Sequence, residues 1–424
     1  MGNETSTQNI KYGQRLNNDV TINWSKGDET SLFQARDGHT ACGVDKKLFV
    51  FGGVVSTDGS EIVESNDLLV FDLDSMTWSK AEVKGQTPSP RSGATMVSIG
   101  NKIYLFGGLS RDSGWFDDLH AYDLATSTWS EIDTATGPAP SPRDKVASVA
   151  IGTKIYIFGG FGPHKGEEDV LGSQDDEEYD EDDDDDMVED QGPQAAADFG
   201  WFDDLYIYDT ENNRWENPQP IKIYSPTPRA AHGMCAVGQN IVIFGGRDAQ
   251  SRRNDLYVLD TEMMKWIQAT GVTGRQPEPR SFHTVTGVGK RVVVIGGRGQ
   301  DNKHFNDLHI FDTETKKWLQ PTQKGCQPPA RGVHTATVVG EHLVVFGGSS
   351  DFDPATMQCQ NYYRDVYVCK TGDILSGQSL PTPPEENQEN VSTSVNISAA
   401  EEGAMKQNET AEVAGTSAVV NGNQ

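Results

Sequence analysis

The sequence predicts an all-β fold, a six-bladed β-propeller, from three features that recur along its 424 residues. A short apolar run ending in Gly-Gly occurs six times, with first glycines at Gly52, Gly107, Gly159, Gly245, Gly296 and Gly347. An arginine stands sixteen residues before each of these glycines, at Arg36, Arg91, Arg143, Arg229, Arg280 and Arg331. Five units carry a tryptophan near their end, at Trp78, Trp129, Trp215, Trp266 and Trp318. Such self-similarity at a regular spacing is typical of a repeat architecture.

Each unit is expected to contain four strands, which we call a to d in sequence order. We expect strand a to start at the arginine and strand b to be the apolar run before Gly-Gly, where glycine permits a close backbone approach. Strand c begins after an aspartate and alternates in polarity, as in residues 66–72 and 254–260. Strand d carries the tryptophan, whose large ring should pack between blades. Four short strands separated by turn signals are typical of a propeller blade.

The sixth unit lacks a tryptophan after Val368, and the missing strand is predicted at the N-terminal side. Trp24 precedes Gly52 by 28 residues, close to the 29 or 30 residues that separate each tryptophan from the next Gly-Gly. A strand over residues 20–26 would therefore complete the last blade and close the ring without a free sheet edge. The expected organisation is an N-terminal segment 1–19, a propeller 20–375 and a disordered tail 376–424. The blades are expected near residues 36–84, 91–136, 143–222, 229–273, 280–323 and 331–372.

These units resemble the kelch repeat, whose pattern is a double glycine, a spaced tyrosine or other apolar residue, and a tryptophan. The resemblance covers residues about 20 to 372 and implies a six-bladed propeller. It does not name a function, because propellers include binding modules and a few enzymes. We expect a non-enzymatic scaffold, effector or regulatory adaptor that binds a partner protein on its b–c and d–a loop face. Nothing resembling a BTB or F-box domain is left over outside the repeats.

An acidic insertion over residues 162–199 interrupts the third unit between strands b and c. The chain runs 56 residues from Gly159 to Trp215, against 21 or 22 in the second, fourth and fifth units. Residues 166–190 hold sixteen carboxylates and neither lysine nor arginine, which is too charged a composition to fold alone. The run is a solvated loop, or a tethered pseudo-ligand that occupies basic loops until an acidic partner displaces it. Weak binding of divalent cations is a third option, although EF-hand spacing is absent. Ser173 fits an acid-directed phosphorylation site, which would add charge.

Basic residues are concentrated on the same loop face. Arg247 and Arg298 directly follow a double glycine, and their two loops also contain Arg252, Arg253, Lys303 and His304. The resemblance implies that arginines after Gly-Gly or at the head of strand a contact acidic ligands, which adds Arg143, Arg229 and Arg280 to the candidates. Bidentate pairing of guanidinium with carboxylate is the physical reason. The alternative for the strand-head arginines is a structural ring, since every unit carries one.

Aromatic and histidine positions give two further hypotheses. The second and third units share the sequence Gly-Trp-Phe-Asp-Asp-Leu, which contains Trp115 and Trp201. An exposed tryptophan pair would anchor a partner, whereas the alternative is that both rings cover the loops. Four units have a histidine three residues after the arginine: His39, His232, His283 and His334. Blade symmetry would hold these rings apart, so we expect packing there and predict neither a metal nor a cofactor.

Composition and missing motifs limit the other functions. A formal charge of -28 disfavours nucleic acid, whose binding needs clustered cations. No signal peptide and no apolar run of membrane-spanning length is present, so we expect the protein in the cytoplasm, or also in the nucleus. We also expect the propeller to be a monomer. Gly2 fits a loose myristoylation pattern without a second anchor.

No nucleophile with an adjacent base is evident, so we expect no catalysis. A metal-dependent kelch enzyme or specifier protein, and a ubiquitin-ligase substrate receptor recruited through the tail, are the alternatives.

Overall fold

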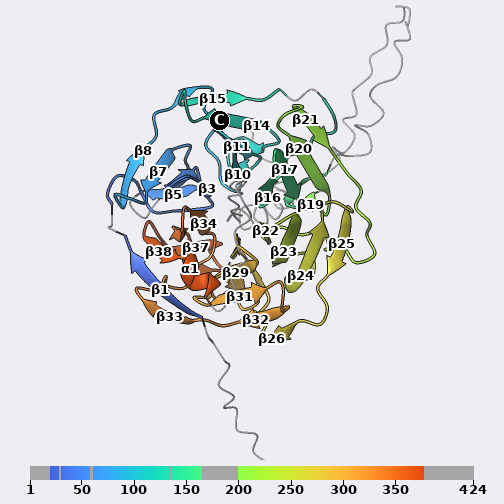
Figure 1. Ribbon diagram of the computed structural model, residues 1–424. Coiled ribbons are helices and arrows are strands. Elements are labelled where there is room, and N and C mark those ends of the chain that lie inside the picture. The colour runs from blue at the N-terminus through green and yellow to red at the C-terminus, as the bar shows by residue number, and fades with distance from the viewer. Residues whose placement is uncertain (1–19, 28–29, 58–60, 134–135, 165–198, 377–424) are drawn as a thin grey trace, which may run out of the picture.

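The computed structural model describes residues 20–27, 30–57, 61–133, 136–164 and 199–376. Six four-stranded antiparallel sheets surround a central axis as the blades of a propeller, which confirms the predicted fold class (Figure 1). Blade 1 consists of β3 (Thr40–Val44), β4 (Lys47–Phe51), β7 (Leu68–Asp72) and β8 (Thr77–Lys80). Blade 2 consists of β10 (Thr95–Ile99), β11 (Lys102–Phe106), β14 (Leu119–Asp123) and β15 (Thr128–Glu131). Blade 3 consists of β16 (Ala147–Ile151), β17 (Lys154–Phe158), β20 (Leu205–Asp209) and β21 (Arg214–Glu216).

The remaining three blades repeat this order of strands from the axis outward. Blade 4 consists of β22 (Gly233–Val237), β23 (Asn240–Arg247), β24 (Arg252–Asp260) and β25 (Lys265–Gln268). Blade 5 consists of β28 (Thr284–Val288), β29 (Arg291–Ile295), β31 (Leu308–Asp312) and β32 (Lys317–Leu319). Blade 6 consists of β34 (Thr335–Val339), β35 (His342–Phe346), β38 (Val366–Lys370) and β1 (Thr21–Lys26).

The N-terminal strand closes the ring, as the position of Trp24 predicted. β1 pairs antiparallel with β38, where Ser25 lies opposite Val368. On its other side β1 pairs in parallel with β33 (Thr322–Gly325), a segment of the linker that leaves blade 5. A strand from near the start of the chain is thus held between two strands from its last quarter, and it supplies the outer strand of blade 6.

The linker between blades adds a fifth, parallel strand to the outer edge of several blades. β9 (Lys84–Gly85) follows blade 1 and pairs with β15 of blade 2, and β26 (Thr273–Gly274) follows blade 4 and pairs with β32 of blade 5. β33 does the same for blade 6. Each linker therefore joins two neighbouring blades at the rim and covers part of the outer strand edge.

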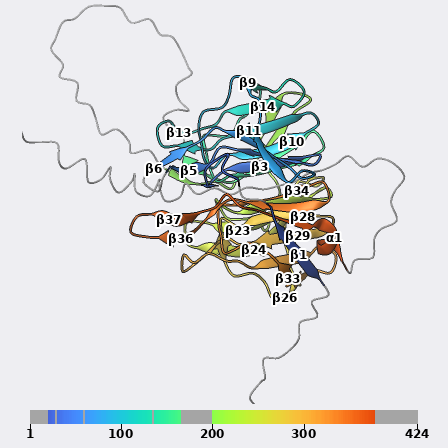
Figure 2. The ribbon, with the colours of Figure 1, turned by 90° about the vertical axis from the view of Figure 1, so that its left-hand side faces the viewer.

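The b–c loops form short hairpins that project on one face, whereas α1 (Thr371–Leu375) lies on the other (Figure 2). The hairpin strands are β5 (Val54–Thr57), β6 (Glu61–Glu64), β12 (Leu109–Ser110), β13 (Gly114–Trp115), β18 (Phe161–Pro163), β19 (Phe199–Trp201), β30 (Arg298–Gly299), β36 (Ser349–Asp353) and β37 (Gln358–Tyr362). Two further short strands, β2 (Arg36–Asp37) and β27 (Arg280–Ser281), precede strand a and pair with the bases of these hairpins. α1 is the only helix in the described residues and is far too short to cross a membrane.

Strand a starts four residues later than the sequence predicted. The inner strands of blades 1 and 5 begin at Thr40 and Thr284, whereas the corresponding arginines are Arg36 and Arg280. The backbone of these arginines pairs instead with the base of the b–c hairpin, in β2 with β5 and in β27 with β30. The arginine therefore belongs to the loop face and not to the inner strand.

The core lies between the blades, and the tryptophans of strand d fill it. Trp129, Trp215 and Trp266 are each 1% exposed. The tryptophan of blades 1 to 5 packs against a strand b phenylalanine of the preceding blade, at ring-centroid distances of 4.5–5.6 Å: Trp78–Phe346, Trp129–Phe51, Trp215–Phe106, Trp266–Phe158 and Trp318–Phe244. The aromatic residue that marks each repeat is thus the contact that holds that blade to its neighbour.

A closed ring of six backbone hydrogen bonds surrounds the axis at the head of the inner strands. Each blade contributes the residue two positions after its arginine, and the N–H of that residue donates to the carbonyl oxygen of its counterpart in the preceding blade at 2.9–3.4 Å. All six residues have a positive φ, between 53° and 74°. Three of them are not small: Lys145, Phe282 and Val333. The axial ring, as we call it, comprises Gly38, Gly93, Lys145, Ala231, Phe282 and Val333.

Candidate functional site

Three of the arginines predicted to bind a partner line one pocket on the b–c hairpin face. The pocket has a volume of about 290 Å³ and lies where the loops of blades 4, 5 and 6 meet. Its lining is Arg247, Gln250, Ser251, Arg252, Arg298, Gln300, Asn302, Phe352, Pro354 and Met357, and we call it the arginine pocket. A larger hollow of about 640 Å³ lies at the closure of blade 6, where lysines and carboxylates mix. We take the arginine pocket as the candidate site because its only ionised side chains are guanidinium groups.

The local backbone of blade 4 brings Arg247 and Arg252 opposite each other. Gly245 and Gly246 have φ values of 66° and 95°, and a Cβ on Gly246 would lie 2.6 Å from the Cβ of His232. Only glycine fits there, so the bulge at this point is fixed by the double glycine. Arg247 then ends β23 and pairs in register with Arg252 at the start of β24.

A turn fixed by Asp248 joins the two strands. Its carboxylate accepts hydrogen bonds from the backbone N–H groups of Gln250 at 3.0 Å and Ser251 at 2.9 Å, an Asx-type turn. The same carboxylate accepts a hydrogen bond from Nε of Arg253. The backbone hydrogen bonds and the pairing with Arg253 hold the pKa of Asp248 below its usual range, although burial opposes them.

Arg252 is held by blade 5. The side chain is 8% exposed, its Nε donates to the hydroxyl of Ser281 at 2.9 Å, and its Nη2 donates to Oδ1 of Asn302 at 3.0 Å. Gln300 donates to the backbone carbonyl of Arg252 at 3.0 Å. These contacts with blade 5 fix the position of the guanidinium group.

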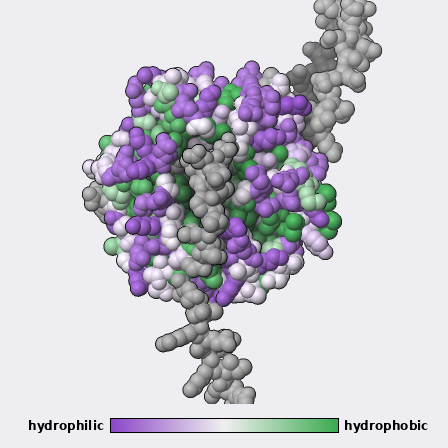
Figure 3. All heavy atoms as spheres, viewed as in Figure 1, coloured by the Kyte–Doolittle hydropathy of each residue, from purple (hydrophilic) through white to green (hydrophobic). Residues whose placement is uncertain are grey.

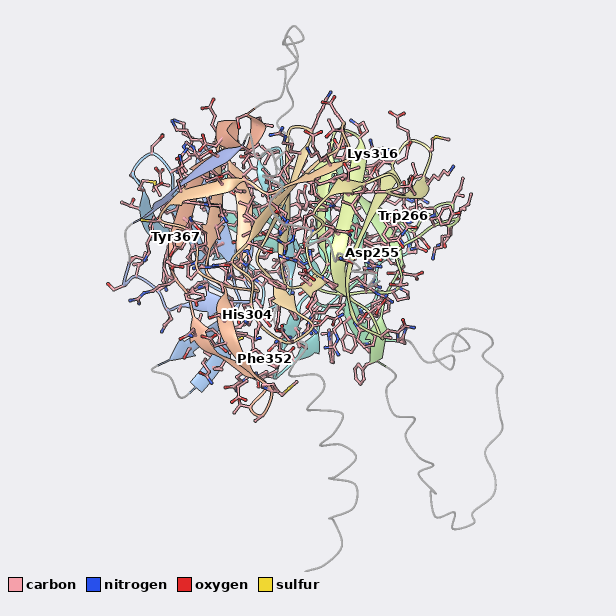
Figure 4. All side chains as sticks on the ribbon, turned by 90° about the horizontal axis from the view of Figure 1, so that it is seen from below. Asp255, Trp266, His304, Lys316, Phe352 and Tyr367 are labelled. Atoms are coloured by element: carbon pink, nitrogen blue, oxygen red, sulfur yellow. The ribbon has the colours of Figure 1, made fainter. Side chains whose placement is uncertain are left out.

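Arg298 is held by two aromatic rings. Its guanidinium carbon lies 4.9 Å from the ring centroid of Phe282 and 4.1 Å from that of Phe352, and the side chain is 3% exposed. Phe352 comes from β36 of blade 6 and lies on the hairpin side of the propeller, away from α1 (Figure 4). Stacking of this kind suits a planar, weakly hydrated guanidinium group, which lysine lacks.

His304, beside the pocket, contributes no positive charge at neutral pH. Burial, reinforced by the charges of Arg298 and Arg252, lowers the pKa of the His304 imidazole to about 4. The positive potential of the site therefore comes from guanidinium groups, which stay charged at every physiological pH.

Two other predicted residues of these loops do not line the pocket. Arg253 bonds to Asp248 and also donates to Oε1 of Gln250 at 3.2 Å. Lys303 is exposed and forms an ion pair with Asp301 at 3.1 Å. The sequence placed all five cations in two loops, and the structure separates Arg247, Arg252 and Arg298 from these two.

The strand-head arginines are buried structural residues, and we remove Arg143, Arg229 and Arg280 from the partner-binding set. All six are at most 1% exposed. In each blade Nη1 donates to the carbonyl oxygen of the first glycine of the double glycine at 2.8–3.1 Å. The guanidinium group also pairs with the aspartate before strand c, at 2.5–3.6 Å: Asp67, Asp118, Asp204, Asp255, Asp307 and Asp365. Because these groups are already paired with a glycine carbonyl and an aspartate and line no part of the arginine pocket, the structural alternative accounts for them.

Trp115 and Trp201 join one aromatic cluster at the base of the hairpins of blades 2 and 3. Their rings lie 6.2 Å and 5.2 Å from that of Phe161, and Trp115 also lies 5.0 Å from Phe199. Nε1 of Trp115 donates to the buried carboxylate of Asp144 at 3.1 Å. Both tryptophans are half-buried, an arrangement that favours the covering role over an exposed anchor pair.

The four histidines near the strand heads are packed in the interior. His39, His232, His283 and His334 are at most 1% exposed. Nε2 of His283 donates to the carbonyl oxygen of Phe244 at 3.0 Å, and burial lowers the pKa of His39 and of His283 to about 3. Within the residues that the structure describes, no group of three or more His, Cys, Asp or Glu side chains could hold a metal ion.

The aromatic and sulfur-containing walls of the pocket were missed by the sequence analysis. Phe282 follows Arg280 by two residues, a repeat position that could have been compared across blades, whereas Phe352 lies in a b–c hairpin whose length varies between blades. Met357 lies in the loop between β36 and β37. The search for charge alone did not single out these residues. Gly2, Ser173 and most of the acidic insertion lie outside the described residues.

Comparison with known proteins identifies the repeats. Residues 14–174 and 193–373 match the family model of the KLHDC2/KLHL20/DRC7 Kelch-repeats domain. The chain is 32% identical over 373 residues to Kelch domain-containing protein 1 of Mus musculus, covering 83% of this chain and 88% of that protein. It is 29% identical over 327 residues to Kelch domain-containing protein 2 of Bos taurus, covering 74% and 76%. It is 28% identical over 317 residues to Acyl-CoA-binding domain-containing protein 4 of Arabidopsis thaliana, covering 70% and 41%.

Proposed function

The chain belongs to the kelch-repeat propeller family, a family of protein-interaction modules, and from that premise we propose that it binds an acidic segment of a partner protein in the arginine pocket. The observation that carries the proposal is the convergence of Arg247, Arg252 and Arg298 on one concave site of about 290 Å³. We propose a role as a scaffold, effector or regulatory adaptor, without catalysis.

Preorganisation of the arginines supports this proposal. A flexible arginine loses side-chain entropy when it binds, whereas Arg252 and Arg298 are already fixed by Ser281, Asn302 and two aromatic rings. A guanidinium group pairs with a carboxylate through two parallel hydrogen bonds, and such charge-assisted bonds are about twice as strong as neutral ones. A carboxylate entering this pocket would therefore gain bonds without ordering their donors.

The shape and the walls of the pocket limit what can enter. Its volume of about 290 Å³ is at the lower end of the range for ligand sites, so it suits one or two side chains of a partner. Phe352, Pro354 and Met357 give one wall an apolar surface that could contact the aliphatic part of a glutamate. The pocket thus favours a short acidic segment over a broad, flat contact.

The test is fluorescence anisotropy with a labelled peptide of the sequence of residues 174–186, which contains eleven carboxylates. The variant Arg247→Ala/Arg298→Ala should weaken its binding by about tenfold or more, because each charge-assisted hydrogen bond contributes roughly 1.5–3 kcal/mol. The matched control is Arg253→Ala/Lys303→Ala, which removes the same two charges from the same two loops. If both variants lose affinity equally, the peptide responds to overall charge, and the pocket proposal fails.

We further propose that the acidic insertion competes for this pocket. Its described anchors, β18 and β19, belong to blade 3, next to the blade that carries Arg247 (Figure 1). Deletion of residues 166–190 should raise the affinity for the same peptide, and addition of phosphate at Ser173 should lower it. Unchanged affinity after the deletion would leave the insertion as a solvated loop. A role as a ligase substrate receptor depends on the tail 377–424, which lies outside the described residues.

A further inference from the structure

The outer rim of blade 4 carries most of the exposed large hydrophobic side chains of the propeller. Eight such side chains occur in the described residues, and five of them, between 45% and 66% exposed, lie on this rim. The other three, Leu32, Val63 and Val83, lie in other blades or linkers. The five, which we call the blade-4 rim patch, are Ile221, Ile223, Tyr224, Met263 and Ile267.

Backbone pairing brings the linker residues of the blade-4 rim patch against the outer strand β25. Ile221 pairs in parallel with Lys265 of β25, and its N–H donates to the carbonyl oxygen of Met264 at 2.8 Å. The N–H of Trp266 in turn donates to the carbonyl oxygen of Ile221 at 3.3 Å, and the Trp266 side chain is buried at 1% exposure. Hydrophobic surface is visible on the rim where β25 lies (Figure 3), and Trp266 marks the same margin in Figure 4. Five side chains of this size and exposure present on the order of 500 Å² of apolar surface, in the upper part of the range for the largest patch of a monomer, which is often functional.

The linker that reaches blade 4 exposes Ile221, Ile223 and Tyr224 because it lacks a glycine. The linkers to blades 2, 3, 5 and 6 place Gly85, Gly137, Gly274 and Gly325 against the outer tryptophan of the next blade, with φ between 77° and 83°. A Cβ at any of these glycines would lie 2.1–2.3 Å from the carbonyl oxygen of that tryptophan. Residues 217–228 contain no glycine, so this linker cannot follow the same close path. The apolar side chains that follow Ile221 in this linker, those of Ile223 and Tyr224, are exposed to solvent.

We infer that the blade-4 rim patch is the interface between two copies of this chain, related by a twofold axis. A twofold interface uses the same surface on both copies, so it needs a patch that complements itself. Charges of both signs flank the patch: Lys222 pairs with Asp203 at 3.0 Å, and Lys265 and Glu262 lie at β25 and the turn before it. Such a border can match itself after rotation, whereas a border of one sign would repel its copy.

The size of the patch fits this occupant. A stable interface buries roughly 800 Å² on each partner, about half or more of it apolar. An apolar centre on the order of 500 Å² with its polar border meets that requirement. Tyr224 would supply a ring of the kind enriched at the centre of interfaces. The rim is separate from the arginine pocket on the hairpin face, so both copies would keep that pocket accessible.

Charge sets the condition under which the dimer forms. Each copy carries a formal charge of -28, and two such copies repel each other. Added salt screens this repulsion, with a Debye length of about 10 Å at 0.1 M and about 3 Å at 1 M. The proposed dimer is therefore stronger at high salt, whereas a contact made by opposite charges would weaken. This inference replaces the monomer expected from the sequence.

The test is the molar mass of the full chain by light scattering, from micromolar to hundreds of micromolar protein and from low to high salt. The wild type should shift from one to two copies as concentration rises, at lower concentration in high salt. Ile223→Asp/Tyr224→Asp should raise the dissociation constant about tenfold or more, as loss of a central anchor does. The matched control Leu32→Asp/Val83→Asp adds the same charge at exposed apolar positions elsewhere and should dimerise like the wild type.

Three results would overturn the inference. One is a wild type that keeps the mass of a single copy at every concentration and salt level. Another is a control variant, Leu32→Asp/Val83→Asp, whose dissociation constant rises as much as that of the rim variant. The third is association that weakens with salt, which would indicate a contact between opposite charges. Melting temperatures of all variants separate a lost interface from a lost fold, and the peptide assay above is unaffected by any of these outcomes.

Discussion

The hairpin face carries two sets of arginines, and they differ in what holds them. The strand-head arginines are paired with aspartates of their own blades, as Arg280 is with Asp307 at 2.6 Å. In the arginine pocket, Arg252 is held by a hydroxyl and an amide, and Arg298 by two aromatic rings. A carboxylate partner neutralises an arginine and makes it part of the fold. Arg252 and Arg298 instead line a concave site on the hairpin face, where a ligand could approach them.

The largest effect expected from this comparison is on stability. Arg280→Ala should lower the free energy of unfolding by about 3 kcal/mol, because it leaves Asp307 and the carbonyl oxygen of Gly296 without their buried partner. Arg247→Ala, in the pocket, should change it by less than about 1 kcal/mol. Chemical denaturation of both variants measures the difference. Equal losses would mean that the two sets of arginines do not differ in role.

Acid should also lower the stability of the fold, because it protonates histidines that are buried next to the strand-head arginines. His283 has a pKa of about 3 in the fold and about 6.5 when unfolded, so the unfolded chain binds an extra proton between these values. Stability therefore falls with pH below about 6.5, by about 2 kcal/mol for this residue at pH 5. His39, also lowered to about 3, acts in the same direction.

The variant His283→Gln isolates this contribution, because a glutamine amide can still donate to the carbonyl oxygen of Phe244. The loss of unfolding free energy between pH 7 and pH 5 should be about 2 kcal/mol smaller in this variant than in the wild type. The control is His164→Gln, on an exposed side chain, which should keep the wild-type loss. An unchanged pH dependence in His283→Gln would mean that this imidazole does not titrate on unfolding in that range.

The smallest effect concerns affinity alone. Phe352→Ala removes one of the two rings that stack on Arg298, a contact contributing roughly 1 kcal/mol, and should weaken binding of the acidic peptide about fivefold. Arg298→Lys keeps the charge and should lose at least as much, since an ammonium group does not stack as guanidinium does. Stability should stay within about 1 kcal/mol in both. Full affinity in Arg298→Lys would show that charge alone matters at this position.

The sequence predicted the blades and the closing strand because the same constraint recurs six times. Trp24 could be placed in phase from the spacing of the other tryptophans, without knowledge of any contact. The start of strand a was predicted four residues early, because the arginine looked like the first residue of a strand. Its backbone pairs with a hairpin that follows it by about twenty residues, and spacing alone does not show that pairing.

The candidate site was predictable only in part. Position after Gly-Gly placed Arg247 and Arg298 on one face, but whether an arginine is buried depends on the aspartate that pairs with it. For Arg280 that partner is Asp307, 27 residues later. Phe352 could not be assigned from spacing, since it reaches Arg298 from a different blade. The exposure of Ile223 likewise depends on a glycine that its linker lacks, a comparison that requires the path of the other linkers.

The axial ring has a consequence for how the propeller opens. Its six hydrogen bonds run from blade to blade and return to the first, so the series has no terminal bond where fraying can begin. Removal of one blade breaks two of the six bonds and releases residues held at positive φ, including Val333. We expect the amide protons of the ring to exchange with deuterium together and only through global unfolding, far more slowly than those of the hairpins above them. The propeller would then behave as one cooperative unit despite its six separate sheets.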